Sequence, residues 1–183
     1  MSTSTADRKT AIAAVAGNLN EELLKLLARQ SRWVPVPVFL GGVLIFGIAY
    51  DSAPRVWLLA WFGGVLAMLI LRFLVLGRLP YRTDVPAHVR LRVAVLLSGL
   101  NGLMHGAAVA FFPFLVEFER FVVFMTILAF CAGSVSSTAG YRPVFLAYVT
   151  PTLVPLAVLW GLNAGDEIQW HHIFVALLTL STA

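Results

Sequence analysis

The sequence predicts an all-α membrane protein: a polytopic bundle of six transmembrane helices, preceded by an amphipathic cytoplasmic surface helix. Composition is the first observation that predicts it, because 60% of the 183 residues are hydrophobic and only 12% are charged. Soluble domains carry about 25% charged residues. The second observation is a mean hydropathy of +0.87. The third is that the apolar residues gather in long segments, with most charges in the short connections between them.

The chain divides into three parts. Residues 1–10 are rich in Ser and Thr, and we expect them to be disordered. In residues 11–32, apolar residues recur at three- and four-residue steps and cations gather near the end, which predicts an amphipathic helix on the membrane surface. A dimer contact through the same face is the alternative. Residues 33–183 form the membrane domain, with spans at about 34–50, 56–76, 93–112, 121–139, 144–162 and 170–183. Because the last segment is shorter than the ~20 residues needed to cross, we expect a domain of a longer protein, whose last span is cut short.

The distribution of Lys and Arg predicts the orientation. Of 13 such residues, only Arg55 and Arg120 fall on one side of the predicted spans, and the other eleven fall on the opposite side. Cytoplasmic loops are enriched in basic residues, so the N-terminus is predicted to be cytoplasmic. Membrane orientation also explains the net charge of +4 without a nucleic-acid partner. Arg72, one turn from the end of the second span, is expected to extend to the lipid interface.

The third span is the polar one. Ser98, Asn101 and His105 follow at i, i+3 and i+7, so they share one helix face. An ionisable residue at membrane depth is a functional-site candidate. The alternative is that Asn101 and His105 form interhelical hydrogen bonds that hold the bundle together.

The fourth and fifth spans form a hairpin that we expect to be the interior of the bundle. Its first helix carries a close-packing face of small residues (Ala129, Ala132, Gly133, Ser136, Ala139 and Gly140). Pro151 and Pro155 leave the carbonyls of Ala147 and Pro151 without their usual donors, and Ser134, Ser137 or Thr138 is expected to supply substitutes. The predicted switch and packing residues are Gly133, Gly140, Pro151 and Pro155. The candidate ligand-binding residues are Asn101, His105, Ser134, Ser137, Thr138, Tyr148 and Thr152.

Metal, cofactor and catalytic chemistry find little support. His171 and His172 adjoin two carboxylates, but neighbouring residues on a helix point about 100° apart, so interface anchoring is favoured over metal binding. No phosphate-binding loop or nucleophile–base motif is present, and no cofactor or catalytic residue is predicted in this segment. Intramembrane carboxylates of the kind used by proton-coupled transporters are also missing, which weighs against transport.

The chain resembles a known family in several stretches. These are a basic approach to the first span (residues 27–33), the Arg72 end of the second, residues 102–108 in the third, and above all residues 132–134, 141–148 and 151–155. In these stretches it is similar to the N-terminal six-helix membrane sensor modules that precede bacterial histidine kinases, often hybrid ones, and diguanylate cyclases. The resemblance covers nearly everything after about Glu21. His105 is a departure, since the family pattern has a tryptophan near this position.

The resemblance implies the input domain of a signal-transduction protein in the bacterial inner (plasma) membrane. The parent protein would be a two-component sensor histidine kinase, or alternatively a diguanylate cyclase; no kinase or cyclase motif lies within these residues. Expected partners are membrane lipids, a small and partly apolar ligand, and a second copy of the chain in a homodimer. Alternatives of another class are a small-solute transporter or channel, and a structural anchor without a ligand.

Overall fold

The computed structural model describes residues 5–31, 34–138 and 141–162, and every regular element within them is helical. The prediction of an all-α class is therefore confirmed. The elements are α1 (Thr5–Ser31), α2 (Pro35–Ala49), α3 (Arg55–Arg78), the 3-10 segment η1 (Leu79–Tyr81), α4 (Ala87–Gly106), the 3-10 segment η2 (Ala107–Phe114), α5 (Glu117–Thr138) and α6 (Arg142–Leu162). Residues 5–10, expected to be disordered, are the first turns of α1. The sixth predicted span, residues 170–183, lies outside the described part.

Four of the described stretches are long and apolar enough to cross a membrane: Arg55–Tyr81, Ala87–Phe114, Glu117–Val135 and Arg142–Leu159. They match the second to fifth predicted spans and fit a membrane-embedded protein. The first predicted span is different. At 15 residues, α2 is only about 22 Å long. It qualifies as a span only together with Gly17–Gln30 of α1, from which it is bent by 49°.

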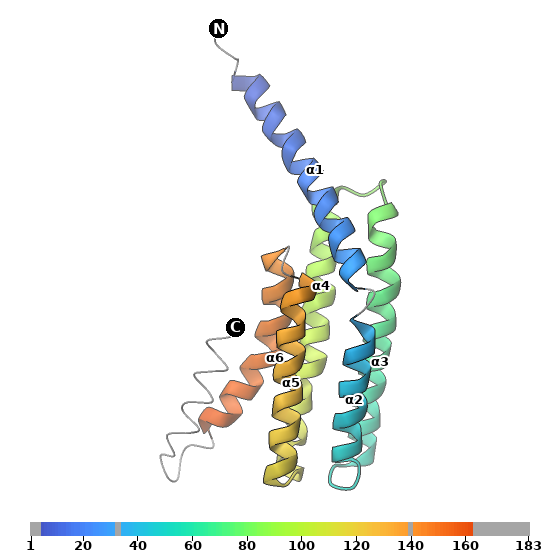
Figure 1. The fold of residues 1–183 in the computed structure, drawn as a ribbon, viewed down its shortest axis with the longest axis vertical. Helices are drawn as coiled ribbons and strands as arrows, with labels where there is room; N and C mark the ends of the chain where they lie inside the picture. The colour runs from blue at the N-terminus through green and yellow to red at the C-terminus, as the bar shows by residue number, and fades with distance from the viewer. Residues whose placement is uncertain (1–4, 32–33, 139–140, 163–183) are drawn as a thin grey trace.

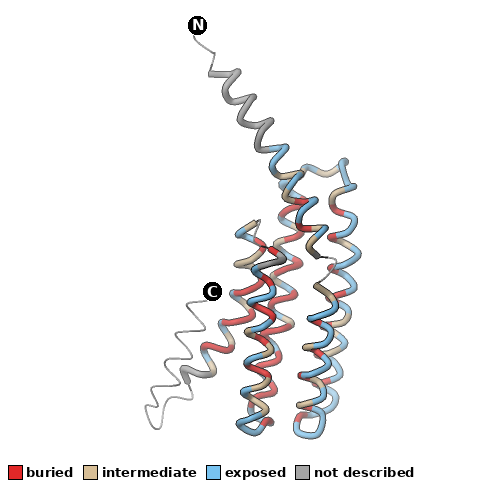
Figure 2. The backbone as a smooth tube through the Cα atoms, in the orientation of Figure 1, coloured by how far each residue is buried: buried red, intermediate tan, exposed pale blue. Residues whose placement is uncertain are grey.

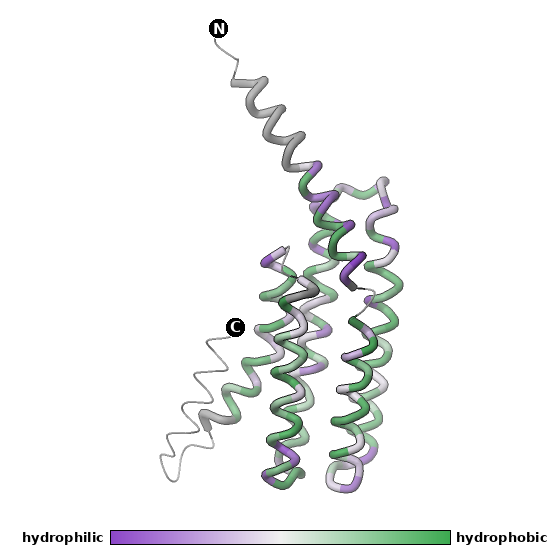
Figure 3. The backbone as a smooth tube through the Cα atoms, in the orientation of Figure 1, coloured by the Kyte–Doolittle hydropathy of each residue, from purple (hydrophilic) through white to green (hydrophobic). Residues whose placement is uncertain are grey.

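Helices α2 to α6 lie side by side along the long axis, and α1 continues that axis beyond the other helices (Figure 1). The connection between α3 and α4, the C-terminal end of α5 and the N-terminal end of α6 lie on the side next to α1 (Figure 1). The connections between α2 and α3 and between α4 and α5 lie at the opposite end (Figure 1). Hydrophilic residues gather at both ends and hydrophobic ones along the middle of the bundle (Figure 3). The basic residues of the α3–α4 connection and Arg142, the first residue of α6, therefore lie on the α1 side, as the sequence predicted.

Buried residues form two clusters along the bundle (Figure 2). The larger joins α2, α3, η2, α5 and α6, with residues such as Ile45, Val65, Ile127 and Leu153 exposed by 1% or less. The smaller lies at the α1 end and joins α1, α3, η1, α4 and α6. Helices α2 to α6 thus bury one side against their neighbours and expose large apolar residues on the other, a pattern that fits a membrane-embedded bundle.

The second half of α1 is part of the bundle. Leu24 and Leu27 are buried in the smaller cluster, so this part of its apolar face meets protein where a membrane surface was expected. Arg90 of α4 holds the same corner together: it donates hydrogen bonds to the carbonyls of Leu79 (3.0 Å) and Val85 (2.9 Å) and pairs with Glu21 of α1. This one buried guanidinium therefore ties α1, the α3–α4 connection and α4 to each other.

Candidate functional site

The polar face of α4 lies inside the bundle. Ser98, Asn101 and His105 are each 1% exposed or less, so the predicted common face is the buried face of the helix. Ser98 Oγ, Asn101 Oδ1 and His105 Nε2 have no hydrogen-bond partner in the described structure. Buried polar atoms are normally paired. Three unpaired ones on a single helix face are therefore a departure that points to a functional region.

The closest helix–helix approach in the described part is between α4 and α6. A Cβ atom added at Gly102 would overlap the carbonyl oxygen of Tyr148, and one added at Gly106 would overlap that of Pro151. Thr152 Oγ1 lies 3.1 Å from Gly102 O and 2.7 Å from Tyr148 O, so its hydroxyl donates a hydrogen bond at the point where α4 and α6 meet. Glycine is needed here because any side chain would force the two backbones apart. We call this contact, made by Gly102 and Gly106 with residues 148–152, the α4–α6 seam.

The sequence placed the close-packing face on α5, but the backbone-to-backbone seam in the described part is made by glycines of α4. Gly133 is exposed, and a Cβ atom added there meets no described atom within 4 Å. The seam uses glycines of the preceding span in its place, because α6 packs most extensively against α4. Gly140, the other predicted packing glycine, lies outside the described residues.

The carbonyls freed by the two prolines also face α4. The helix α6 continues through both Pro151 and Pro155. Ala147 O lies 3.5 Å from the Cβ position of Gly99, and Pro151 O lies against Gly106. The expectation that hydroxyls of α5 would satisfy these carbonyls is wrong for the two that are described. Ser134 Oγ bonds to Cys131 O (2.6 Å) and Thr138 Oγ1 to Ser134 O (2.6 Å), both within α5.

A cavity of about 70 Å³ lies between α2, α3, α4, α5 and α6. Its polar lining comes from Arg72, Asn101, Ser134, Thr138 and Tyr148, one or two residues from each of the last four helices. Its apolar lining is Val34, Pro37, Val38, Ala129, Phe130 and Gly133. A cavity of this size is large enough for several waters or for the polar end of a small molecule.

Arg72 is the charged group of this cavity. Its side chain is 6% exposed, its Nε has no hydrogen-bond partner, and no carboxylate within the described residues pairs with it. The expectation that Arg72 extends to the lipid interface is therefore wrong. The buried face of α3 includes Val65, Leu69 and Leu76, and Arg72 falls in the same helical register. That register was the sequence signal that could have placed it inside.

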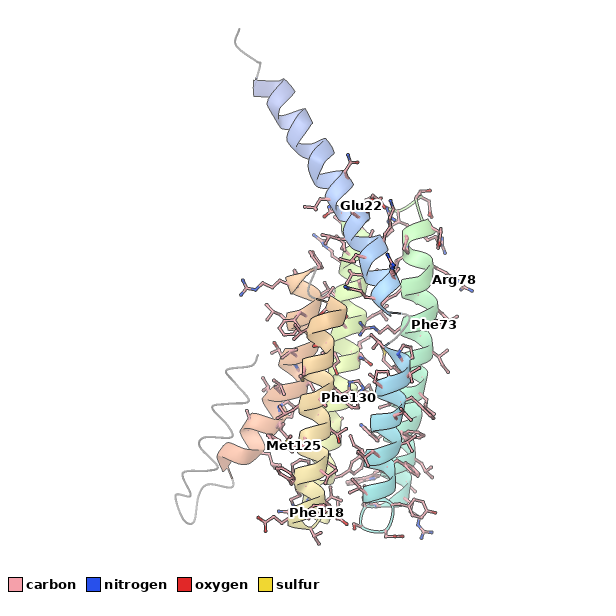
Figure 4. The ribbon with its side chains drawn as sticks, viewed as in Figure 1. Glu22, Phe73, Arg78, Phe118, Met125 and Phe130 are labelled. Atoms are coloured by element: carbon pink, nitrogen blue, oxygen red, sulfur yellow. The ribbon has the colours of Figure 1, made fainter. Side chains whose placement is uncertain are left out.

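His105 acts on the cavity through a neighbour. Its Nδ1 lies 2.8 Å from the hydroxyl of Tyr148, and its ring stacks against Phe130 with centroids 4.7 Å apart. Phe130 projects from α5 towards α2 (Figure 4), where its ring fills the space beside Gly41. Tyr148 and Phe130 both line the cavity, so the imidazole fixes two of its walls without lining it.

Four of the seven candidate ligand-binding residues thus come together around one cavity: Asn101, Ser134, Thr138 and Tyr148. Thr152, by contrast, does not line this cavity, and its hydroxyl belongs to the seam. The side chain of Ser137 and the residues His171 and His172 lie outside the described part. Besides Arg72, the sequence interpretation missed Trp61, which is buried and donates from Nε1 to Met104 O (2.8 Å) near the end of α4.

No family model, curated protein or solved structure matches this chain. Functional inference therefore depends on the arrangement of its own residues.

Proposed function

We propose that this chain is the membrane-embedded input domain of a bacterial signal-transduction protein in the inner membrane, with its N-terminus in the cytoplasm. It would bind a small, partly apolar ligand and relay that event to a cytoplasmic output domain, most directly a histidine kinase of a two-component system. A diguanylate cyclase is the alternative output. The proposal also includes a homodimer as the signalling unit.

The observation that carries this proposal is that one helix forms both a wall of the cavity and the seam. Tyr148 of α6 lines the cavity, and its own carbonyl oxygen is the atom against Gly102. A ligand that displaces the Tyr148 ring therefore acts on the backbone at the contact with α4. Because the seam is backbone against backbone, no flexible side chain absorbs the displacement, and the helices must shift as units.

The composition of α6 supports a second packing state. Pro151 and Pro155 remove two backbone hydrogen bonds from the turns that face α4. Beyond them α6 slants away from the other helices towards its C-terminal end (Figure 1). A helix with two missing bonds bends at lower cost than an intact one, so a small push at Tyr148 is amplified at the far end.

A cavity-filling variant tests this function without knowledge of the ligand. In a Cys131→Ala background, spin labels on the exposed positions 59 (α3) and 158 (α6) report the distance between the lower ends of these helices. Ser134→Met fills part of the cavity and should shift the distance distribution. Ala132→Met, on an exposed residue that does not line the cavity, should leave it unchanged. An unaltered distribution in Ser134→Met would refute the proposed coupling.

A transporter or channel remains the alternative of another class. Solute flux into proteoliposomes containing the wild-type protein distinguishes the two, because an input domain needs no continuous path across the membrane. Flux above that of empty liposomes, with no change of the α3–α6 distance in Ser134→Met, would favour transport.

A further inference from the structure

Within the described residues, no carboxylate pairs with the buried guanidinium of Arg72. The nine acidic residues of the chain are Asp7, Glu21, Glu22, Asp51, Asp84, Glu117, Glu119, Asp166 and Glu167. None lies inside the four candidate spans away from their ends, and the nearest along the chain to Arg72 is Asp84. Glu21, which reaches the bundle from α1, is paired with Arg90. A buried guanidinium without a counter-charge carries a desolvation cost of several kcal/mol.

The groups facing Arg72 across the cavity suit an anion. Asn101 lines the cavity and its Oδ1 has no hydrogen-bond partner in the described structure, so no bond at that atom prevents the amide from turning its NH₂ group to an acceptor. Orphaned buried N–H groups are rarer than under-satisfied acceptors, which favours a proton on His105 Nδ1, with Nε2 left as the unpaired atom. The Nδ1–H then donates to the Tyr148 oxygen, so the phenol proton is not used by His105 and can be donated to a group in the cavity.

We propose that the cavity is an oxyanion-binding site in which Arg72 binds a carboxylate, assisted by Asn101 and Tyr148. Arginine's planar fork matches a carboxylate with two parallel hydrogen bonds. The bound group supplies the missing counter-charge and engages the unpaired Nε of Arg72. This inference deepens the proposed function, since it assigns the chemical class of the ligand's polar end.

The entrance to the site lies between α2 and α5. Pro37, Ala129 and Gly133 line the cavity and are exposed at the bundle surface, whereas Val38 and Phe130 deeper in are buried. Small side chains on α5 therefore leave the rim open. Ala129 and Gly133 belong to the face of small residues that the sequence assigned to helix packing. Arg72 lies six residues, or about 9 Å of helix, from the end of α3 at Arg78. A carboxylate can thus arrive free in water or as the head group of an amphiphile in the bilayer.

Thermal unfolding in phosphatidylcholine nanodiscs tests the site at neutral pH, with octanoate, octanol and acetate as probes. Octanoate should raise the melting temperature of the wild-type protein, and octanol, which has a similar chain without the charge, should not. Arg72→Gln should remove the octanoate effect and weaken the apparent affinity by about tenfold or more. Arg72→Lys, which keeps the charge but loses the fork, should fall between the two. Equal shifts with octanol and octanoate, or a full octanoate shift in Arg72→Gln, would overturn the proposal.

Two further comparisons make the outcome decisive. If acetate raises the melting temperature as much as octanoate does, the natural ligand is a soluble carboxylate. If only octanoate raises it, the natural ligand is a membrane amphiphile. Both results support the site. Gly133→Leu provides the matched test if Arg72 variants fail to fold. A Cβ atom at Gly133 meets no described atom within 4 Å, so the leucine should extend from the rim across the entrance and abolish the octanoate shift, while Ala132→Leu should preserve it. Octanoate binding that leaves the α3–α6 distance unchanged would refute the sensor function and keep the oxyanion site.

Discussion

The α4–α6 seam makes Gly102 the position where the smallest change should have the largest structural effect. In Gly102→Ala, the new methyl group would overlap Tyr148 O and lie 3.0 Å from Pro151 Cγ. The backbone oxygen cannot turn away as a side chain would, so α4 and α6 must separate. Overpacking of this kind costs about 1–3 kcal/mol, and loss of the hydrogen bond from Thr152 to Gly102 O adds about 0.6 kcal/mol. We therefore expect a loss of about 1.6–3.6 kcal/mol.

Gly63→Ala is the matched control. Gly63 is exposed on α3, and a Cβ atom there meets no described atom within 4 Å, so alanine should be neutral or stabilise the helix by about 0.5–1 kcal/mol. The measurement is the free energy of unfolding of both variants, from denaturant titration in detergent followed by circular dichroism. Equal stability of Gly102→Ala and Gly63→Ala would show that α4 and α6 do not pack through their backbones.

Three other predictions follow from the same structure. In intact cells, a cysteine at Ser52 should react with a membrane-impermeant thiol reagent and one at Thr83 should be protected. The reason is that the positive-inside rule places the α3–α4 connection in the cytoplasm. The reverse labelling pattern would contradict this orientation. Arg90→Met should lower the free energy of unfolding by about 2–4 kcal/mol, since it leaves the carbonyls of the α3–α4 connection and Glu21 unpaired. An unchanged free energy of unfolding would mean that α1 docks on the bundle without the Arg90 contacts. The double variant Pro151→Ala, Pro155→Ala should restore two backbone hydrogen bonds, straighten α6 and hold the α3–α6 distance in one state. If its spin-label distance distribution still responds to Ser134→Met, the prolines are not the switch.

Much of the fold was predictable from the sequence because its signals are local. The apolar segments predicted four helices whose ends lie within six residues of those of the four candidate spans, and the spacing of Ser98, Asn101 and His105 placed them correctly on one face. Helical register depends only on the chain itself, so such predictions transfer well to the structure.

Which neighbouring helix packs against each helix face could not be predicted in the same way. Small residues on α5 and glycines on α4 give the same pattern in sequence, yet Gly102 packs against α6 while Gly133 lies at the rim of the cavity. Arg72 shows the same limit: its distance from the helix end is compatible with lipid contact, and only the rotation of α3 in the bundle turns it inward. Helix rotation is set by long-range packing, which hydropathy does not encode.

The distance between spin labels at positions 59 and 158, measured with and without octanoate, tests most directly whether the cavity controls α6. In the labelled Cys131→Ala protein with Arg72 intact, we predict that octanoate shifts the distance distribution and that octanol does not. The Arg72→Gln variant should lose the octanoate shift. An octanoate-bound protein with the same α3–α6 distance as the free one would contradict a sensor in which Arg72 and Tyr148 transmit ligand binding to the α4–α6 seam.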